Sequence, residues 1–293
     1  MNKLLMIYNP NSGKKNITTH LDKIIEIFAA EGKLLTLYRI GKNSGNDIKK
    51  IISSGEYEGV IVCGGDGSVN TTAQTILETG LDIPMGIIPN GTCNDFSRSL
   101  GMPNDLLRCA RLVAQGNVMK TDIGIINGGE SVFVNELAGG MLVSVSFNTD
   151  QNLKKMFGPL AYYVNGIGEL TSMKPFDITI ETEDNVYNEQ ALVFVVLNGT
   201  DMSGFSNVIK EAHMQDGYMD ILIFKNTKPL EMTDTLIKFV TGGDFRDENV
   251  VRIKTRKCKI TCPDSISTTV DGEKGPTFPI ELEMKKEAIS VYY

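Results

Sequence analysis

The sequence of 293 residues has no hydrophobic segment long enough to cross a bilayer. Its longest uninterrupted apolar run, residues 191–197, is far shorter than the about 20 residues that a membrane-spanning helix needs. Polar Asn9, Asn11 and Ser12 follow only a short apolar stretch, and this pattern differs from that of a secretory signal. We therefore expect neither a spanning helix nor a cleaved leader.

Cysteine, histidine and positive charge are also scarce. Five scattered cysteines without a CxxC pair are typical of reduced thiols in a cytosol, and they argue against a disulfide scaffold or a Cys-rich zinc site. Only His20 and His213 are available for histidine-based catalysis. The net charge of −7 argues against nucleic-acid binding, which normally needs a basic surface. The sequence thus predicts a cytoplasmic protein without a nucleic-acid partner.

The hydrophobic pattern changes near residue 122, and the length suits two domains at about 150 residues each. Before that point, strand-like runs alternate with helical patterns, which predicts a parallel sheet with crossover helices. The strand-like runs are 4–8, 34–40, 59–63 and 85–88, and the helical patterns are 21–28, 48–52 and 69–77. After it, helical patterns occur only near 159–171 and 230–239, and strand-like runs dominate. These runs are 123–126 and 132–137 as a hairpin, then 176–181, 191–197, 218–224, 250–262, 265–270 and 280–284. We expect an α/β domain followed by a β-sandwich-like domain.

The segment Gly64-Gly65-Asp66-Gly67-Ser68 follows an apolar strand and precedes a helical pattern. Its glycines let backbone N–H groups approach a phosphate, and the helix adds a partial positive charge. Asp66 would crowd a bare phosphate, so a role toward Mg²⁺ or its water is favoured. Taken alone, the segment is equally typical of a tight turn. Asn70 replaces the last glycine of a GxGxxG motif, which disfavours a dinucleotide reductase.

Two more polar loops, residues 9–15 and 89–95, follow the first and fourth predicted strands. They offer backbone donors, hydroxyls and ammonium groups to a polyphosphate. Taken alone, the first loop is more typical of an ordinary turn with solvated lysines, and a helix N-cap at Asn94 or Asp95 would explain the second. Because loops at the carboxyl ends of parallel strands share one edge of a sheet, we expect the three loops to converge.

Together these loops resemble the diacylglycerol kinase catalytic family, in its soluble bacterial lipid-kinase branch. The family patterns NPxSG, GGDGT and PxGTxNDFAR occur in order at residues 9–13, 64–68 and 89–98. The segments 122–124, 216–220 and 271–273 also resemble family motifs, so the resemblance covers nearly the whole chain. Three positions depart from it: Ser68 replaces Thr, Ile40 replaces a nucleotide-contacting Thr, and Asn165 stands where some relatives carry Lys.

The resemblance implies an ATP-binding α/β domain over residues 1–122, to which a C-terminal segment near 285–293 returns. It implies a β-sandwich domain for the lipid substrate over residues 123–284, with ATP in the cleft between the domains. These boundaries agree with the change of pattern near residue 122.

The resemblance also assigns roles to individual residues. Asp66 and Asp122 would hold the catalytic Mg²⁺, directly or through water, and Glu273 would be the general base for the lipid hydroxyl. A second, structural Mg²⁺ would take the Asp216 carboxylate and the main-chain carbonyls of His213 and Tyr218. The residues expected to contact ATP are Asn9, Ser12, Lys14, Gly64, Gly65, Asp66, Gly67, Ser68, Val69, Asn70, Thr71, Gly91, Thr92, Asn94 and Arg98.

The function implied is an ATP- and Mg²⁺-dependent lipid kinase, most simply one that converts diacylglycerol to phosphatidic acid. The alternatives are an NAD kinase, which shares the GGDG loop, and a nucleotide-binding regulator without catalysis. Residues 9–13 and 271–273 favour the lipid kinase over the NAD kinase. The presence of Asp66, Asp122 and Glu273 together counts against the regulator.

A lipid substrate predicts peripheral contact with the inner face of the membrane. Two basic stretches are candidates for this contact, residues 154–157 and 252–259, although a lysine-protected edge strand is the favoured interpretation of the second. The polar run 198–207 suits either the lining of the acceptor site or an exposed loop. An exposed sheet edge would also permit a homodimer.

Overall fold

The computed structural model describes residues 2–10, 12–13, 17–41, 45–140, 174–240 and 248–293. In these residues no helix is long and apolar enough to cross a membrane. The chain divides into two compact units, the first comprising residues 1–122 and 286–293 and the second residues 123–285. The predicted helix at 159–171, the basic residues 154–157, Asn165, Asn11 and Lys14 lie outside the described residues.

The first unit alternates strands and helices along the chain, as the sequence predicts. Its elements are β1 (Asn2–Tyr8), α1 (Ile17–Ala30), β2 (Lys33–Arg39), α2 (Gly45–Ser53), β3 (Gly59–Gly64), α3 (Asp66–Thr79), β4 (Met85–Pro89), α4 (Asp95–Ser99) and α5 (Leu106–Gln115). The unit is completed by the start of β5 (Val118–Ile126) and the end of β15 (Ile280–Tyr292).

The sheet of the first unit is parallel, with strand order β15-β4-β3-β1-β2. The chain runs from β1 outward to β2 and then crosses to β3 on the other side of β1. This reversal places a topological switch point between the carboxyl ends of β1 and β3, where ligands of such sheets bind. The loops after β1 and β3 start at this point.

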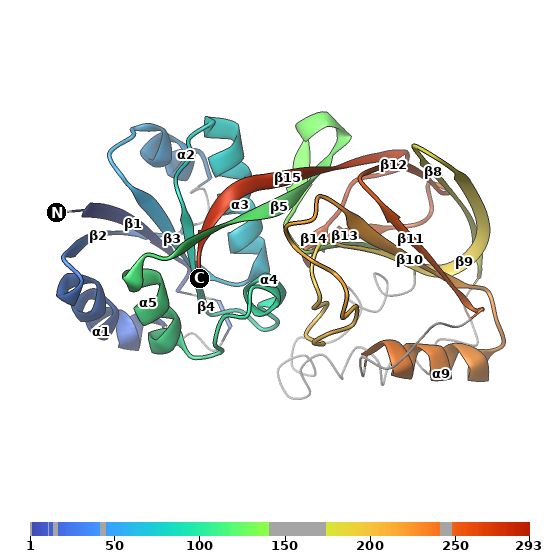
Figure 1. Ribbon diagram of the computed structural model, residues 1–293, viewed down its shortest axis with the longest axis horizontal. Helices are drawn as coiled ribbons and strands as arrows, with labels where there is room; N and C mark the ends of the chain where they lie inside the picture. The colour runs from blue at the N-terminus through green and yellow to red at the C-terminus, as the bar shows by residue number, and fades with distance from the viewer. Residues whose placement is uncertain (1, 11, 14–16, 42–44, 141–173, 241–247) are drawn as a thin grey trace. The chain divides into compact units, whose positions relative to one another are not determined.

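Helices cover both faces of this sheet, α1 and α5 on one and α2 and α3 on the other (Figure 1). Alternate strand residues such as Leu4 and Met6 pack with Phe28 of α1 and Val113 of α5. Strands β3 and β4 are buried on both faces, which explains why their sequences are continuous apolar runs rather than alternating ones.

The end of β15 completes this sheet beside β4. The ring of Tyr292 lies against Gly59 and Gly86: a Cβ on Gly59 would lie 2.6 Å from the Tyr292 hydroxyl, and one on Gly86 3.2 Å from the ring. Asp82 accepts hydrogen bonds from Ser290 (3.0 Å) and Lys120 (2.8 Å) and thereby ties the last strand to the unit.

The second unit is built mostly of antiparallel strands. After the remainder of β5 and a short 3₁₀ turn (Asn127–Gly129) come β6 (Ser131–Phe133), β7 (Glu136–Gly140), β8 (Phe176–Thr182), β9 (Val186–Leu197), β10 (Met219–Lys225), α9 (Pro229–Val240), β11 (Val250–Thr255), β12 (Lys257–Thr261), β13 (Thr268–Val270), β14 (Glu273–Lys274) and the start of β15. The main path is β14-β13-β7-β9-β8-β12-β15, and β10 joins β9 to β11.

Strands β9 and β10 separate two hydrophobic cores. Phe194 and Ile221 face a core closed by β8, β12 and β15, whereas Val195 and Leu222 face a core under α9. Figure 1 shows α9 along the outer side of these strands. The predicted fold class, an α/β domain with a β-sandwich-like domain, is confirmed, and so is the helix near 230–239.

Two predicted strands are interrupted. The run 132–137 forms two short strands, because the N–H groups of Val134, Asn135 and Glu136 bind the carboxylate of Asp271 instead of a sheet partner. The run 250–262 is broken at Arg256. In the described residues β11 pairs with β10 alone, whereas β12 lies between β8 and β15. The edge-strand prediction for 252–259 is therefore correct for β11 and wrong for β12.

Candidate active site

Three loops meet at the switch point of the first unit, those after β1, β3 and β4. The N–H of Asn9 donates to the carbonyl of Cys63 (3.1 Å), and the N–H of Asn90 donates to the carbonyl of Gly64 (2.8 Å). The Asn90 side chain reaches the carbonyl of Ser12 at 3.5 Å. The predicted convergence of the three loops is confirmed.

Glycines make this convergence possible. Gly65 and Gly91 touch through their backbones, and a Cβ on Gly65 would lie 3.0 Å from the Cα of Gly91. Gly13 has a φ of +47° and presses against the carbonyls of Asn90 and Gly91, so a Cβ on Gly13 would lie 3.0 Å from the Gly91 oxygen. A side chain at any of the three positions would push the loops apart. The result is a backbone-lined surface at the start of α3, whose N-terminus favours anions.

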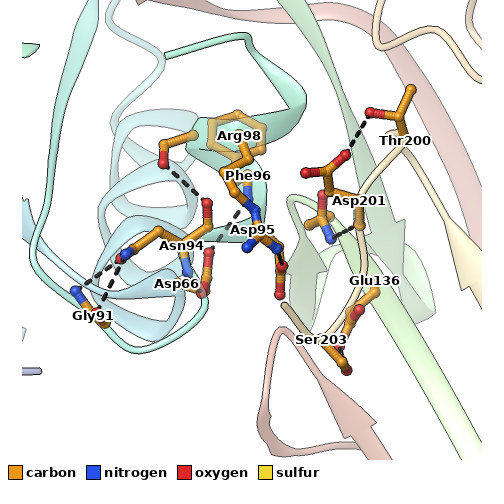
Figure 2. A network of polar contacts seen from close by, with 12 residues as sticks. Asp66, Gly91, Asn94, Asp95, Phe96, Arg98, Glu136, Thr200, Asp201 and Ser203 are labelled. Atoms are coloured by element: carbon orange, nitrogen blue, oxygen red, sulfur yellow. Dashed lines mark hydrogen bonds and ion pairs between the residues drawn. The ribbon is translucent and has the colours of Figure 1, made fainter. Parts of the chain in front are cut away.

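The Asp66 carboxylate joins the β3 loop to the β4 loop. Figure 2 shows it beside Asn94 and Phe96. One oxygen accepts the N–H of Asn94 (2.9 Å) and the other accepts the N–H of Phe96 (3.3 Å), at the start of α4. Asn94 in turn clamps Gly91, accepting its N–H (2.8 Å) and donating to its carbonyl (3.2 Å).

Burial raises the pKa of the Asp66 carboxyl above its ordinary value of 3.8. The backbone N–H groups directed at it, those of Phe96 and Asn94 first, offset part of this rise because they stabilise the ionised form. A carboxylate raised in energy by its surroundings gains from a cation or proton brought to it, as functional carboxylates often do.

The other predicted nucleotide residues differ in what they present. Thr92 is exposed, whereas Val69 is buried in the core and has only its backbone to offer. The Thr71 hydroxyl donates to the carbonyl of Gly67 (2.9 Å) within α3. Arg98 pairs with Asp95 inside α4, so its guanidinium is already engaged with a carboxylate (Figure 2).

Asp122 is fully buried in β5. Its carboxylate accepts the N–H of Glu287 at 2.7 Å, and Glu287 has a φ of +51°, unusual for a residue other than glycine. The hydrogen bond from Glu287 to Asp122 therefore holds the backbone of β15 where that strand enters the first unit.

In the second unit, Glu273 stands beside a two-residue turn. Val270 pairs with Glu273, and Asp271 and Gly272 between them have φ of +47° and +84°, as in a type I′ turn. The Glu273 side chain is exposed. The Asp-Gly pair thus explains the position of this carboxylate at the end of a narrow hairpin.

Asp271 fixes that hairpin and is buried. Its Oδ1 accepts the N–H groups of Asn135 and Glu136, both at 2.9 Å, and its Oδ2 accepts the N–H of Val134 at 2.8 Å. Its own N–H donates to the carbonyl of Glu136 (3.0 Å). Sequence reasoning treated 271–273 as one motif and missed this division: Asp271 organises the backbone, while Glu273 reaches solvent.

The polar run 198–207 folds back on the same backbone. Asn198 donates through its side chain to the carbonyl of Val134 (2.8 Å), and Asn135 donates to the carbonyl of Asp201 (2.8 Å). A tight turn at Ser203 and Gly204, both with positive φ, brings the Ser203 hydroxyl to Glu136 at 3.1 Å (Figure 2). Asn198 and Asp201 are buried whereas Ser206 and Asn207 are exposed, so only the end of this run is an exposed loop.

Asp216 does not have the surroundings of a Mg²⁺ ligand. One of its oxygens lies 2.7 Å from the Lys254 ammonium, and the other accepts the N–H of Tyr218 at 2.9 Å. The structural Mg²⁺ implied by the resemblance does not fit here.

Comparisons with known proteins divide the chain into two parts, each matching a known domain family. Residues 3–126 match the diacylglycerol kinase catalytic domain family, and residues 138–293 match the YegS C-terminal NAD kinase beta sandwich-like domain family. A diacylglycerol kinase of Staphylococcus carnosus is 31% identical over 98% of this chain and 94% of its own.

The chain belongs to the diacylglycerol kinase family. A Staphylococcus aureus diacylglycerol kinase of this family is 32% identical over 98% of the chain and 91% of its own. The crystal structure of a candidate diacylglycerol kinase from Bacillus anthracis covers the whole chain and 95% of its own, with a TM-score of 0.84 and 28% identity. The protein is accordingly an enzyme, a kinase that acts on lipid.

Proposed function

We propose that this lipid kinase transfers the γ-phosphate of ATP to the hydroxyl of diacylglycerol, giving phosphatidic acid and ADP. The observation that carries the proposal is the meeting of three glycine-containing loops at the switch point of the parallel sheet. The diacylglycerol kinases named among its relatives supply the acceptor.

The loops suit the phosphates of ATP. Backbone groups of Gly65 and Gly91 approach each other closely enough to leave a side-chain-free surface, and the first turn of α3 adds N–H donors. Phosphoryl transfer depends mainly on positioning and on neutralising charge, for which such a surface is suited. The exposed Thr92 and the polar Asn9 and Ser12 border it.

A catalytic Mg²⁺ is part of this proposal, because Mg²⁺ in kinases is held by one or two carboxylates together with substrate phosphates. Asp66 would hold it, since burial raises the free energy of its ionised form, and Asp122 is the second carboxylate predicted for the ion. When bound, Mg²⁺ would neutralise charge on the transferred phosphoryl group. Asp66 also holds the β4 loop in place through Asn94 and Phe96.

Glu273 is the proposed general base. Its carboxylate would accept the proton of the lipid hydroxyl as the new O–P bond forms and the bond from the γ-phosphorus to the β-phosphate oxygen breaks. Its exposure on a narrow hairpin leaves it accessible to a hydroxyl, and the backbone contacts of Asp271 hold that hairpin. Contact with a lipid surface belongs to this proposal, since the acceptor resides there.

The test is phosphate transfer from labelled ATP with Mg²⁺ to a panel of lipids in mixed micelles, with NAD alongside. We expect labelled phosphatidic acid. Replacing Glu273 by Gln should lower kcat by about 10²–10⁴ and leave ATP binding intact. The matched control is Glu281→Gln, another exposed carboxylate of the second unit, which should keep full activity.

A second candidate is NAD kinase activity, because the family matched by residues 138–293 is described as NAD kinase-like. Labelled NADP from the same panel would establish it. Transfer to a lipid other than diacylglycerol would support the assignment as a lipid kinase and would show that the proposed acceptor is wrong. Undiminished phosphate transfer by Glu273→Gln would show that Glu273 is not the general base.

A further inference from the structure

The loop before β10 carries an acidic residue, Asp216, that is neutralised from the neighbouring strand. The Lys254 ammonium of β11 lies 2.7 Å from one Asp216 oxygen. The other oxygen accepts the N–H of Tyr218 at 2.9 Å and closes the turn at Gly217, which has a φ of +80°. Both carboxylate oxygens therefore have partners supplied by the chain.

This ion pair is part of an ordered stripe. Arg252 and Lys254 alternate along β11 with the buried Ile253 and Thr255, so their side chains share one face, and Arg256 directly follows the strand. Arg252 binds Asp220 at 3.0 Å, while the Arg256 guanidinium lies 4.8 Å from the centre of the Tyr218 ring and 3.0 Å from its hydroxyl. The Lys254 ammonium lies 5.7 Å from the same ring centre.

The charge at this point excludes a second cation on the same carboxylate. Mg²⁺ requires near-octahedral oxygen ligands, and here its carboxylate ligand is shared by an ammonium and an amide. A divalent ion on Asp216 would face the Lys254 charge at close range, and the Arg256 guanidinium lies over the same Tyr218 ring as Lys254. The ammonium and a divalent ion so placed would repel each other, so only one of them serves as the counter-ion of Asp216.

We propose that Lys254 takes the place of a structural divalent cation at the Asp216 loop, so that the second unit keeps this loop folded without Mg²⁺. The ammonium supplies the positive charge, and the Tyr218 ring and Asp216 oxygen fix its position. Any requirement for Mg²⁺ in catalysis then concerns the nucleotide alone. This inference is independent of the proposed acceptor and base.

The test measures melting temperature and cation binding of the nucleotide-free protein, in excess EDTA and in millimolar MgCl₂. The effect of Mg²⁺ on the loop is the effect measured for the wild type minus the effect measured for Asp216→Asn, because only the wild type has the carboxylate. Lys254→Met removes the charge and keeps the stem, and Lys254→Arg keeps the charge. Lys259→Met is the matched control, because Lys259 is an exposed lysine of the adjacent region of sheet.

We expect no Asp216-dependent response of the wild type to Mg²⁺, by melting or by calorimetry. Lys254→Met should melt about 1–3 °C below Lys259→Met, as the loss of a part-exposed ion pair predicts, and Lys254→Arg should melt near the wild type. Mg²⁺ should stabilise Lys254→Met through the vacated carboxylate, and the double variant with Asp216→Asn should not respond.

Two results would overturn the proposal. One is a Mg²⁺-dependent rise in the wild-type melting temperature that Asp216→Asn abolishes, because it would place the divalent ion on this carboxylate. The other is a Lys254→Met protein that melts no lower than Lys259→Met, because Lys254 would then contribute nothing to the loop. Neither result depends on which lipid the enzyme phosphorylates.

Discussion

Each unit of the kinase contains an aspartate whose carboxylate holds the backbone of a loop distant in sequence, yet the two are used differently. Asp271 is buried and receives three backbone N–H groups at 2.8–2.9 Å. Asp66 is only partly buried and makes hydrogen bonds of 2.9 and 3.3 Å, and burial raises its pKa. A carboxylate with few donors, such as Asp66, can still gain from a cation, whereas one with three donors, such as Asp271, is suited to holding the backbone. The donors around a carboxylate are therefore more informative than the motif in which it occurs.

The comparison is tested most severely by removing the charge of Asp66. Asp66→Asn should lower kcat/KM by about 10²–10³, the size of effect seen when one preorganised electrostatic group is lost. The measurement is the rate of lipid phosphorylation, and Asp22→Asn, an exposed carboxylate on α1, serves as control. Activity within a few-fold of the wild type would show that Asp66 is as structural as Asp271.

Asp271→Ala should have the largest effect on stability. It leaves three buried N–H groups without their acceptor, and the free energy of unfolding should fall by about 3 kcal/mol or more. Urea denaturation measures the loss, and amide hydrogen exchange over residues 134–136 should accelerate selectively. Asp264→Ala, an exposed aspartate of the same unit, should be nearly neutral. Slow exchange at 134–136 in the variant would contradict the assigned role.

Gly91→Ala tests whether loop contact in the first unit creates the nucleotide site. The new Cβ would overlap Gly65 and separate the β3 and β4 loops, so we expect the Kd for ATP to rise about tenfold, as overpacking of this kind costs 1–3 kcal/mol. Gly80→Ala is the control: its Cβ would meet nothing within 4 Å, and its φ of +67° strains an alanine at the far end of α3, away from the loops. Equal ATP affinity of Gly91→Ala and Gly80→Ala would show that nucleotide binding does not depend on the contact between Gly65 and Gly91.

Thiol labelling distinguishes the site from the cores. Burial raises the pKa of Cys109, Cys258 and Cys262 to about 12 and that of Cys63 further, so at pH 8 only about one in ten thousand of the first three is thiolate. Cys93 lies in the β4 loop and is partly exposed. We expect one fast-reacting thiol per native chain, absent in Cys93→Ser and slowed by ATP. A fast phase that persists in Cys93→Ser would disprove the assignment.

The smallest effect is the pH dependence contributed by Asp66. Because its pKa is raised in the folded state, the unfolded chain loses this proton first as pH rises above 3.8. The stability of the wild type should therefore fall relative to that of Asp66→Asn from pH 3.8 up to the folded pKa, and the difference should then stay constant. The measurement is the unfolding free energy of both proteins across this pH range. If the wild type instead gained stability relative to Asp66→Asn as the pH rises, the pKa of Asp66 would be lowered in the folded state and not raised.

The sequence was most informative where local patterns decide structure. Apolar runs and the turns after them predicted the parallel sheet, and parallel topology alone implied that the loops would meet at one edge. The buried strands β9 and β10 were found as continuous apolar runs for the same reason.

Contacts between distant residues were not predictable from local pattern. The break between β6 and β7 depends on Asp271, more than 130 positions away, and the acidic partners of β11 lie on another strand or in the loop before it. The basic run 252–259 therefore suggested a membrane contact or a single edge strand, although Arg252 and Lys254 are neutralised within the fold. The roles of Glu273 as a base and of Asp66 and Asp122 as magnesium ligands stay predictions.

The final strand has a consequence for the order in which the protein is made. The first unit needs the end of β15 beside β4, with Tyr292 filling the space left by two glycines. During synthesis the sheet of the first unit therefore gains β15 only after residues 123–285 have been translated. The first unit is therefore discontinuous in the chain, and its sheet cannot be complete before the second unit has been synthesised.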